Sequence, residues 1–276
     1  MTDIYQFNHR AMATYFEVRI AGEERTYAAQ AAQASLDLLD KLESCLSRFR
    51  ANSDITQIAR LEPGEKMRLS QPAFDCLEIA KKMELATFGA FSATAAAMQT
   101  QTSLPLWHLL SEELAIQCES GRMHFDLGAI GKGFALDQMA ELLRSWDCPS
   151  FLLVAGGSSI LSGAPPKDTA GWSCGLGDDH ATQRFFLAHA SLSGSGLAVK
   201  GNHILDPRTG QPAARQNRVW ALADIAAESD ALSTACMVLS EPELEKVLVQ
   251  NHSWQFFLET DKAVRPIGVR ALPPQA

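Results

Sequence analysis

The middle of the chain is a series of short apolar runs separated by turn residues, and this feature constrains the fold most strongly. Such runs are typical of strands that are connected by hairpins. We predict strands over Ser150–Ala155, Gly171–Leu176, Arg184–His189, Ala198–Leu205 and Arg218–Ile225, and further strands over Ala13–Ile20, Trp254–Leu258 and Ala263–Val269. Helical patterns precede and follow this region, over Thr26–Leu46, Pro72–Thr87, Asp230–Leu239 and Glu241–Asn251.

Because the helices flank the strands rather than alternate with them, we predict an α+β fold with mostly antiparallel sheets flanked by helices. A doubly wound parallel sheet would need a helix between successive strands. The sequence has no internal repeat and no clear linker, so we expect residues 1–276 to form a single unit of one or two lobes.

Residues 125–145, FDLGAIGKGFALDQMAELLRS, place three glycines around one lysine where an apolar period begins. Met123–Leu127 is predicted as a short strand, and the residues after the glycines have the spacing of an amphipathic helix with Asp137 on its polar face. A glycine-rich turn before a helix offers free N–H groups and the positive end of the helix dipole, which suit a phosphate. The glycine spacing differs from the dinucleotide fingerprint and from the P-loop, so a plain tight connection stays open as an alternative.

The chain has a net charge of −8 and no Lys/Arg-rich run, which argues against nucleic acid or an anionic membrane as the main partner. No stretch approaches the ~18 consecutive apolar residues of a membrane span, so we expect no stable membrane insertion. The six cysteines are scattered without a metal-binding spacing, as in a reducing compartment. Since the N-terminus also lacks the features of a signal peptide or a lipobox, we expect a cytoplasmic protein.

A second stretch, ESDALSTACMVL (228–239), brings a carboxylate and a hydroxyl onto one face of a predicted helix. Asp230 and Thr234 are four residues apart, so their side chains stack on one another. Such oxygen ligands suit Mg²⁺, which takes one or two protein carboxylates and leaves its other positions to waters and phosphates. The alternative is structural, because Ser229 or Asp230 could be the N-cap of the helix.

Three further stretches are typical of turns when each is considered alone. VAGGSS (154–159) suits a hairpin turn and SLSGSG (191–196) a flexible turn, whereas HILDPRTG (203–210) has Pro and Gly at the positions that a tight turn prefers. The turn does not explain why His203 immediately precedes an apolar pair.

Taken together and in this order, the motifs resemble those of the ApbE family, the FAD:protein FMN transferases. DLGAIGKGFALD (126–137) is very similar to the family's D-L-G-G-I-A-K-G-Y-A-V-D, HILDPRTG is almost unchanged, and DALSTA (230–235) is similar to D-A-L-A-T-A. Further family segments are matched by MATYFEV (12–18), SRFRANSDI (47–55), GAF (89–91) and SLSGS (191–195).

The resemblance implies an ApbE-like fold and an enzyme that binds FAD with Mg²⁺, releases AMP and attaches FMN to a threonine of an acceptor protein. It implies that the metal is held by Asp230, Thr234 and the backbone carbonyl of Ala129. It also implies a flavin nucleotide site lined by Met12, Ala90, Asp126, Lys132, His203 and Ile204. His203 is then a candidate base toward the threonine hydroxyl, and Asp230 is catalytic through the metal. The glycines would let the backbone approach the metal–diphosphate group, with Lys132 adding charge.

The chain departs from the family pattern at several positions, among them Gly196, where Tyr is usual. Ser92 stands where Asp is usual and Ala59 where Asn is usual, and the segment that follows Ser92 matches poorly. Two alternatives to flavin transfer therefore stay open. An FAD diphosphatase would use the same metal residues with water in place of the threonine, and a flavin-binding protein would have lost the chemistry.

Overall fold

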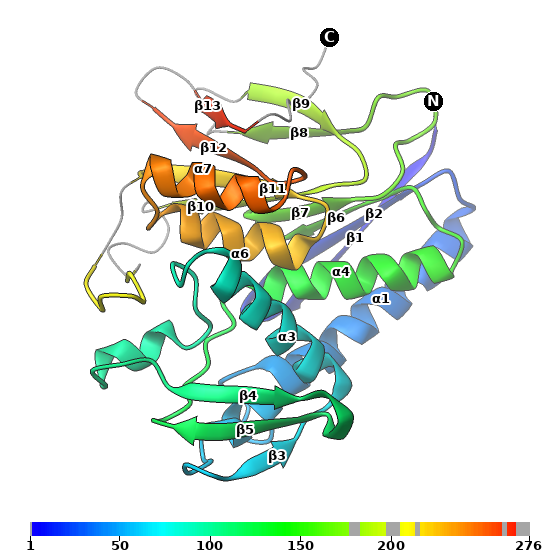
Figure 1. The fold of residues 1–276 in the computed structure, drawn as a ribbon. Coiled ribbons are helices and arrows are strands. Elements are labelled where there is room, and N and C mark those ends of the chain that lie inside the picture. The colour runs from blue at the N-terminus through cyan, green and yellow to red at the C-terminus, as the bar shows by residue number, and fades with distance from the viewer. Residues whose placement is uncertain (1, 177–182, 197–204, 213–215, 261–263, 269–276) are drawn as a thin grey trace.

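The computed structural model describes residues 2–176, 183–196, 205–212, 216–260 and 264–268. Its main element is an eight-stranded sheet with the order β1-β2-β6-β7-β10-β11-β12-β13 (Figure 1). All neighbouring strands in this sheet pair antiparallel, which confirms the predicted α+β class. The strands are β1 (Ile4–Ala11), β2 (Thr14–Ala21), β6 (Phe151–Ala155), β7 (Ser159–Ser162), β10 (Ser191–Gly196), β11 (Arg218–Ala223), β12 (Gln255–Glu259) and β13 (Val264–Ile267).

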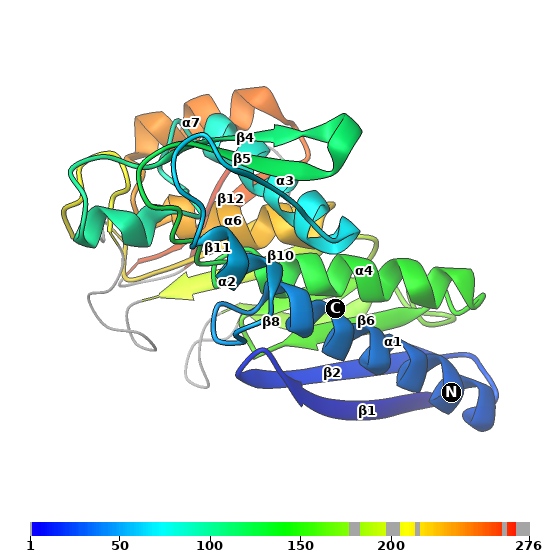
Figure 2. The ribbon, with the colours of Figure 1, turned by 90° about the horizontal axis from the view of Figure 1, so that it is seen from below.

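Helices cover one face of this sheet (Figure 1). The helices that pack directly on its strands include α1 (Arg25–Leu46), α4 (Gly131–Ser145) and α6 (Ala226–Cys236). A further helix, α3 (Gln71–Ala86), packs against α1 and α6, as the view from below shows (Figure 2). The apolar faces of these helices and of the inner strands share one large core, whose fully buried members include Phe16, Leu39, Leu77 and Leu136.

The described residues also form two smaller sheets. The hairpin of β8 (Trp172–Leu176) and β9 (Gln183–Leu187) packs Leu176, Phe185 and Leu187 against apolar side chains of β10, β11 and β12. The other small sheet lies beyond α3 and has the order β3 (Lys66–Arg68), β5 (Ala115–Ser120) and β4 (Leu106–Leu110) (Figure 1). Further short helices in the described residues are α2 (Asp54–Ile58), η1 (Ala95–Gln99), η2 (Ser111–Glu113) and α7 (Glu241–Gln250).

Two predictions about local structure are wrong. Met123–Leu127 forms no strand, because the Asp126 N–H donates to the carbonyl of Ala93 at 2.7 Å and the segment pairs with an irregular loop instead of a sheet edge. SLSGSG is not a flexible turn but β10, a central strand that pairs with both β7 and β11. The strand predicted over Ala198–Leu205 lies outside the described residues except for Leu205, which makes a single bridge to Pro212.

The turn between β1 and β2 has an uncommon backbone. Met12 and Ala13 form a two-residue hairpin loop with φ angles of 50° and 57°. A loop with φ > 0 at both positions matches the right-handed twist of the strands, and it normally contains glycine or asparagine. The Met12 N–H donates to Oε1 of Glu43 on α1 at 3.0 Å, which ties this turn to the helix layer.

The helices in the described ranges include none that is long and apolar enough to cross a membrane. All six cysteines are free thiols, as the scattered spacing predicts. Burial raises the pKa of Cys148 to about 11 and that of Cys174 to about 12, so these thiols stay protonated and unreactive near neutral pH.

Candidate functional site

Helices α4 and α6 come into backbone contact at Gly133. A Cβ atom at Gly133 would lie 2.1 Å from the carbonyl oxygen of Ala226, so the contact requires glycine. By contrast, a Cβ atom at Gly131 would lie 3.5 Å from Cβ of Leu127, which is an ordinary packing distance. Gly133 therefore admits a second helix, and the expectation that the glycines also let the backbone approach a metal–diphosphate group stays a prediction.

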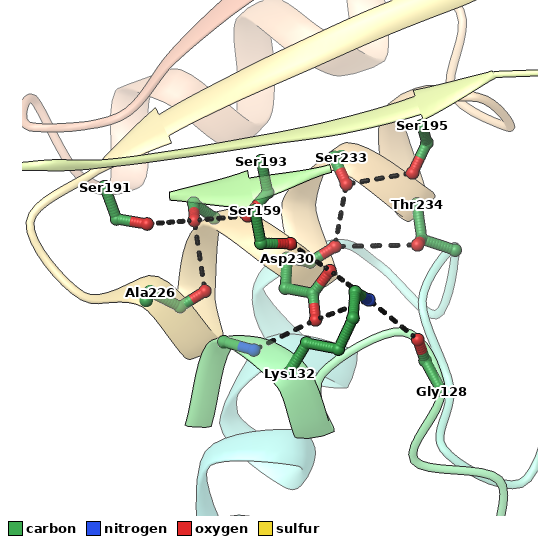
Figure 3. Close-up of polar contacts among 12 residues, drawn as sticks. Gly128, Lys132, Ser159, Ser191, Ser193, Ser195, Ala226, Asp230, Ser233 and Thr234 are labelled. Carbon is green, nitrogen blue, oxygen red and sulfur yellow. Dashed lines mark hydrogen bonds and ion pairs between the residues drawn. The ribbon is translucent and has the colours of Figure 1, made fainter. Parts of the chain in front are cut away.

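Asp230 lies where the two helices meet, and only 4% of its surface is exposed (Figure 3). Its Oδ2 accepts a hydrogen bond from the Gly133 N–H at 3.1 Å, and its Oδ1 accepts one from the Ser159 hydroxyl at 3.3 Å. Because α6 begins at Ala226, Asp230 lies beyond the first residues of the helix, and the alternative that Ser229 or Asp230 is the N-cap is wrong. The carboxylate is held between α4 and β7.

Lys132 is ion-paired with this carboxylate. Its Nζ lies 3.1 Å from Oδ1 and 3.2 Å from Oδ2 of Asp230, and it also donates to the carbonyl oxygen of Gly128 at 3.2 Å. The Lys132 side chain is 19% exposed, so the cation is partly shielded from water. A carboxylate and a backbone carbonyl thus already converge on a positive charge at the N-terminal end of α4 (Figure 3).

Thr234 lies one turn after Asp230 on α6 and is half-buried. Its hydroxyl donates to the carbonyl oxygen of Asp230 at 3.5 Å, which is a weak hydrogen bond. Serine hydroxyls attach the same helix to β10, with Ser229 bonded to Ser191 and Ser193 at 2.7 and 2.9 Å, and Ser233 bonded to Ser195 at 2.9 Å. The predicted pair of carboxylate and hydroxyl therefore stands on a helix that is fixed on two sides.

The other predicted nucleotide-binding residues in the described part of the chain lie on loops. Asp126 accepts the Gly128 N–H at 2.9 Å and lies 3.3 Å from the guanidinium of Arg48. Met12 lies in the β1–β2 turn, and Ala90 is buried in the segment after α3. Ala129 is half-buried next to Gly128, so the carbonyl that contacts Lys132 precedes the predicted metal ligand by one residue.

The DPRTG segment is a turn, as its sequence predicts. Asp206 accepts the N–H groups of Thr209 and Gly210 on its carbonyl oxygen, and its carboxylate binds the guanidinium of Arg208 at 2.9 and 2.8 Å. Burial alone would raise the pKa of Asp206, but the hydrogen bonds from Arg208 outweigh it and hold the pKa below its ordinary value. A Cβ atom at Gly89 would lie 3.4 Å from Cγ of Arg208, so the turn contacts the GAF segment.

Two predicted site residues, His203 and Ile204, lie outside the described residues. Two of the departures from the family pattern, Ser92 and Ala59, can be placed. The Ser92 hydroxyl bonds to Oγ1 of Thr94 at 3.1 Å within the loop. Ala59 lines a cavity of about 180 Å³ together with Arg48, Ile55, Thr56, Ala96, His124 and Phe125. Since Arg48 also binds Asp126, this cavity lies beside a predicted nucleotide-binding residue.

Two residues near Asp230 escaped the sequence analysis. Ser159, which closes the VAGGSS hairpin, donates to the carboxylate, and Asp137 of α4 contacts the start of α6. The position of Ser159 two residues after a glycine pair was a signal, but it is equally expected of a plain hairpin. For Asp137 the signal was the need of α6 for an acceptor at its first N–H groups. The sequence does not show that this acceptor comes from another helix.

The donors around Asp230 fit a hard cation better than a soft one. In the described ranges, no group of three or more His, Cys, Asp or Glu side chains is arranged to hold a metal. The available ligands are oxygens: the Asp230 carboxylate, the Thr234 hydroxyl and a backbone carbonyl at Gly128 or Ala129. A site with one carboxylate suits Mg²⁺, which commonly keeps its remaining positions for waters and substrate phosphates.

Comparisons with known proteins agree with the motifs. Residues 12–258 match the model of the ApbE family. The chain is 32% identical over 145 residues to an FAD:protein FMN transferase of Treponema pallidum, an alignment that covers 45% of this chain and 40% of that protein. It is 20% identical over 299 residues to an FAD:protein FMN transferase of Escherichia coli strain K12, covering 94% of this chain and 85% of that protein.

Solved structures give the same result for the fold. The apo form of the flavinyl transferase ApbE of Pseudomonas stutzeri has a TM-score of 0.82 at 18% identity, covering 96% of this chain and 94% of that chain. At this identity the likeness establishes the fold. The family model, by contrast, covers most of the sequence, including the GKG turn and the DALSTA helix. The chain belongs to the ApbE family.

Proposed function

We propose that this protein is an FAD:protein FMN transferase, which moves the FMN moiety of FAD onto a threonine of an acceptor protein and releases AMP. The observation that carries the proposal is the convergence of Asp230, Lys132 and the N-terminal end of α4 on one point. A diphosphate with its cation needs this combination of a carboxylate, a positive charge and the positive end of a helix dipole.

In the proposed reaction the threonine hydroxyl oxygen attacks the FMN phosphorus. The bond from that phosphorus to the bridging oxygen breaks, AMP leaves with the bridging oxygen, and the threonine proton passes to a base. Mg²⁺, when bound, would neutralise the charge that develops on the diphosphate oxygens. Asp230 and Thr234 would hold it, with the backbone carbonyl of Ala129.

The residues of the chain have separate roles in this proposal. A divalent cation bound to Asp230 would neutralise the carboxylate that pairs with Lys132. The Lys132 ammonium would then be free to turn toward the diphosphate. Met12, Ala90, Asp126 and Ile204 would line the nucleotide site. His203 would take the threonine proton, a role that typically accelerates a reaction by roughly 10²–10⁴.

One assay distinguishes the alternatives. The protein is mixed with FAD, MgCl₂ and an acceptor protein that carries a flavinylation threonine, and with the same acceptor in which alanine replaces that threonine. We expect flavin fluorescence on the threonine acceptor alone, with one AMP per attached FMN. Free FMN and AMP in equal amounts with both acceptors would instead indicate a diphosphatase. Bound FAD that stays intact would indicate a flavin-binding protein and overturn the proposal.

A further inference from the structure

The first turn of α6 is capped by a side chain from another helix. Its N-cap residue is Ile225, whose side chain has no hydrogen-bond acceptor. Instead, Oδ1 of Asp137 on α4 accepts the Ala226 N–H at 2.8 Å, and Oδ2 accepts the Ala227 N–H at 2.8 Å. The first N–H groups of a helix have no partner within the helix, so both oxygens of this carboxylate satisfy donors that would otherwise be unpaired.

Contacts from α4 converge on three residues at the start of α6. Asp137 binds the N–H groups of Ala226 and Ala227, Gly133 lies against the carbonyl of Ala226, and the Gly133 N–H donates to Asp230. These contacts fix both the height of α6 along α4 and its rotation about its own axis. A helix held in this way carries its side chains to fixed positions, and Asp230 follows Ala226 by about one turn.

We propose that Asp137 is a positioning residue that sets the register of α6 against α4 and thereby places Asp230 for cation binding. The proposal rests on the metal role of Asp230 in the proposed function. Asp137 does not itself need to contact the cation, because its two hydrogen bonds go to backbone groups. Its effect passes through the rigid first turn of α6, where the serine bonds to β10 complete the attachment.

Neighbouring charges and burial both act on the Asp137 carboxylate. Glu228 of α6 repels its negative charge, whereas Arg144 on the next turns of α4 attracts it. Burial is the largest influence on the group, and it raises the pKa of Asp137 to about 7 despite both hydrogen bonds. Both backbone hydrogen bonds favour the charged form, whose two oxygens can each accept an N–H group.

The test compares wild type with Asp137→Asn, an isosteric change. The asparagine oxygen can accept one N–H, but its NH₂ group then faces the other. We expect faster hydrogen exchange at the amides of Ala226 and Ala227, and also at Gly133, whose N–H reports on the position of Asp230. With Mn²⁺ as a paramagnetic probe in place of Mg²⁺, titration followed by EPR should give a Kd that is about 10–100-fold weaker, the usual effect of losing a supporting contact behind a metal ligand.

Glu24→Gln is the matched control. Glu24 is also a carboxylate that accepts two N–H groups of a first helical turn, those of Thr26 and Tyr27 on α1 at 3.0 and 3.1 Å. Its replacement should speed exchange at the start of α1 and leave both the Gly133 amide and the Mn²⁺ Kd unchanged. The melting temperature Tm is measured for all three proteins to separate lost stability from lost position.

The outcomes are distinct. Unchanged exchange at Ala226, Ala227 and Gly133 in Asp137→Asn overturns the proposal. So does a lower Tm with an unchanged Mn²⁺ Kd in the folded variant, because that result describes a purely structural cap. If wild type itself does not bind Mn²⁺, the metal assignment in the proposed function fails, and the Gly133 amide alone decides whether Asp137 positions Asp230.

Discussion

The ammonium of Lys132 lies 3.1 Å from the Asp230 carboxylate, although the two residues are 98 positions apart in the chain. This pair joins the glycine-rich turn of α4 to the DALSTA helix, two of the motifs that carry the family resemblance. In the protein without a divalent cation, the ammonium balances the carboxylate. Because the two charges neutralise each other, we expect substitution of either residue to change the stability of the metal-free protein.

Replacing Asp230 by alanine should abolish divalent cation binding and turnover, because Asp230 supplies the single carboxylate assigned to the metal. It should also lower the free energy of unfolding by about 1–3 kcal/mol, since the Gly133 N–H and the Lys132 ammonium lose their buried acceptor. Mn²⁺ titration and urea unfolding measure the two effects. Asp40→Ala, which removes an exposed carboxylate paired with His9, should change neither. Retained Mn²⁺ binding in Asp230→Ala would refute the metal assignment.

Replacing Lys132 by alanine should lower the Tm of the metal-free protein, because the buried Asp230 carboxylate is left without its cation. The helix dipole alone predicts the opposite sign, since a lysine at a helix N-terminus is mildly unfavourable. Added MgCl₂ should therefore raise the Tm of Lys132→Ala more than that of wild type, as Mg²⁺ replaces the missing charge. Lys66→Ala, which breaks an exposed pair with Glu113, should change the Tm little with or without MgCl₂. An unchanged Tm in metal-free Lys132→Ala would contradict the pairing.

Much of the fold could be predicted because apolar periodicity reports directly on burial. α1, α3, α4, β2 and β6 have clear periods, and the structure contains them with small shifts at their ends. β10 was missed because its inner positions are serines rather than apolar residues, and their hydroxyls bond to Ser229 and Ser233 of α6. A strand whose buried face is polar has no hydrophobic alternation to detect.

The site could be predicted only where it is local in sequence. The spacing of Asp230 and Thr234 follows from the helical repeat, so it was available from the sequence. The role of Asp137 was misjudged, because its place on the polar face of α4 predicts contact with solvent, whereas that face meets the unpaired N–H groups of α6. Such a match between two helices depends on how they pack, and a periodicity argument treats each helix alone.

The Met12–Ala13 turn predicts a stabilising substitution. Ala13 has a φ of 57°, a region that glycine adopts without the steric cost that a Cβ atom brings. We expect Ala13→Gly to raise the free energy of unfolding by about 0.5–1 kcal/mol, the steric relief being partly offset by greater freedom in the unfolded chain. Ala11→Gly, in the adjacent strand position of β1, should lower it by a similar amount. Thermal or urea unfolding of both variants tests the difference, and a destabilising Ala13→Gly would exclude strain at this turn.

The stability of the protein should depend on pH through Asp137. Its folded-state pKa of about 7 lies above the ordinary value of 3.8, because burial disfavours the charged form. The native state therefore binds this proton more tightly than the unfolded state, and the resulting stabilisation is present at low pH and lost as the pH rises through 7. Glu243, whose pKa is lowered to about 2 by hydrogen bonds from Ser240, acts in the opposite direction only at more acidic pH.

The measurement is the Tm of wild type and of Asp137→Asn between about pH 5 and pH 8. The Tm of wild type should fall relative to that of the variant over this range, and histidine titration cancels in the difference because both proteins share it. A difference that stays constant across the range would show that Asp137 is not protonated near neutral pH in the folded protein.

Two glycines of one turn should respond to alanine in opposite directions. At Gly133 the new Cβ would lie 2.1 Å from the carbonyl oxygen of Ala226, a backbone atom that cannot rotate away. The helices α4 and α6 would have to separate, which should lower the free energy of unfolding by about 1–3 kcal/mol, as overpacking usually does. The same displacement would lengthen the hydrogen bond from the Gly133 N–H to Asp230, so Mn²⁺ affinity should fall as well.

At Gly131 the new Cβ meets only Leu127 at 3.5 Å, an ordinary contact. Gly131→Ala should therefore leave Mn²⁺ affinity unchanged and raise the free energy of unfolding by about 0.4–1 kcal/mol, because alanine restricts the unfolded chain at a position where it fits the native backbone. Urea unfolding of both variants should show a lower free energy of unfolding for Gly133→Ala and a higher one for Gly131→Ala. Mn²⁺ titration should show the weaker affinity for Gly133→Ala. Equal behaviour of the two variants would mean that the approach of α6 does not depend on Gly133, and that the glycines serve the turn rather than the contact between helices.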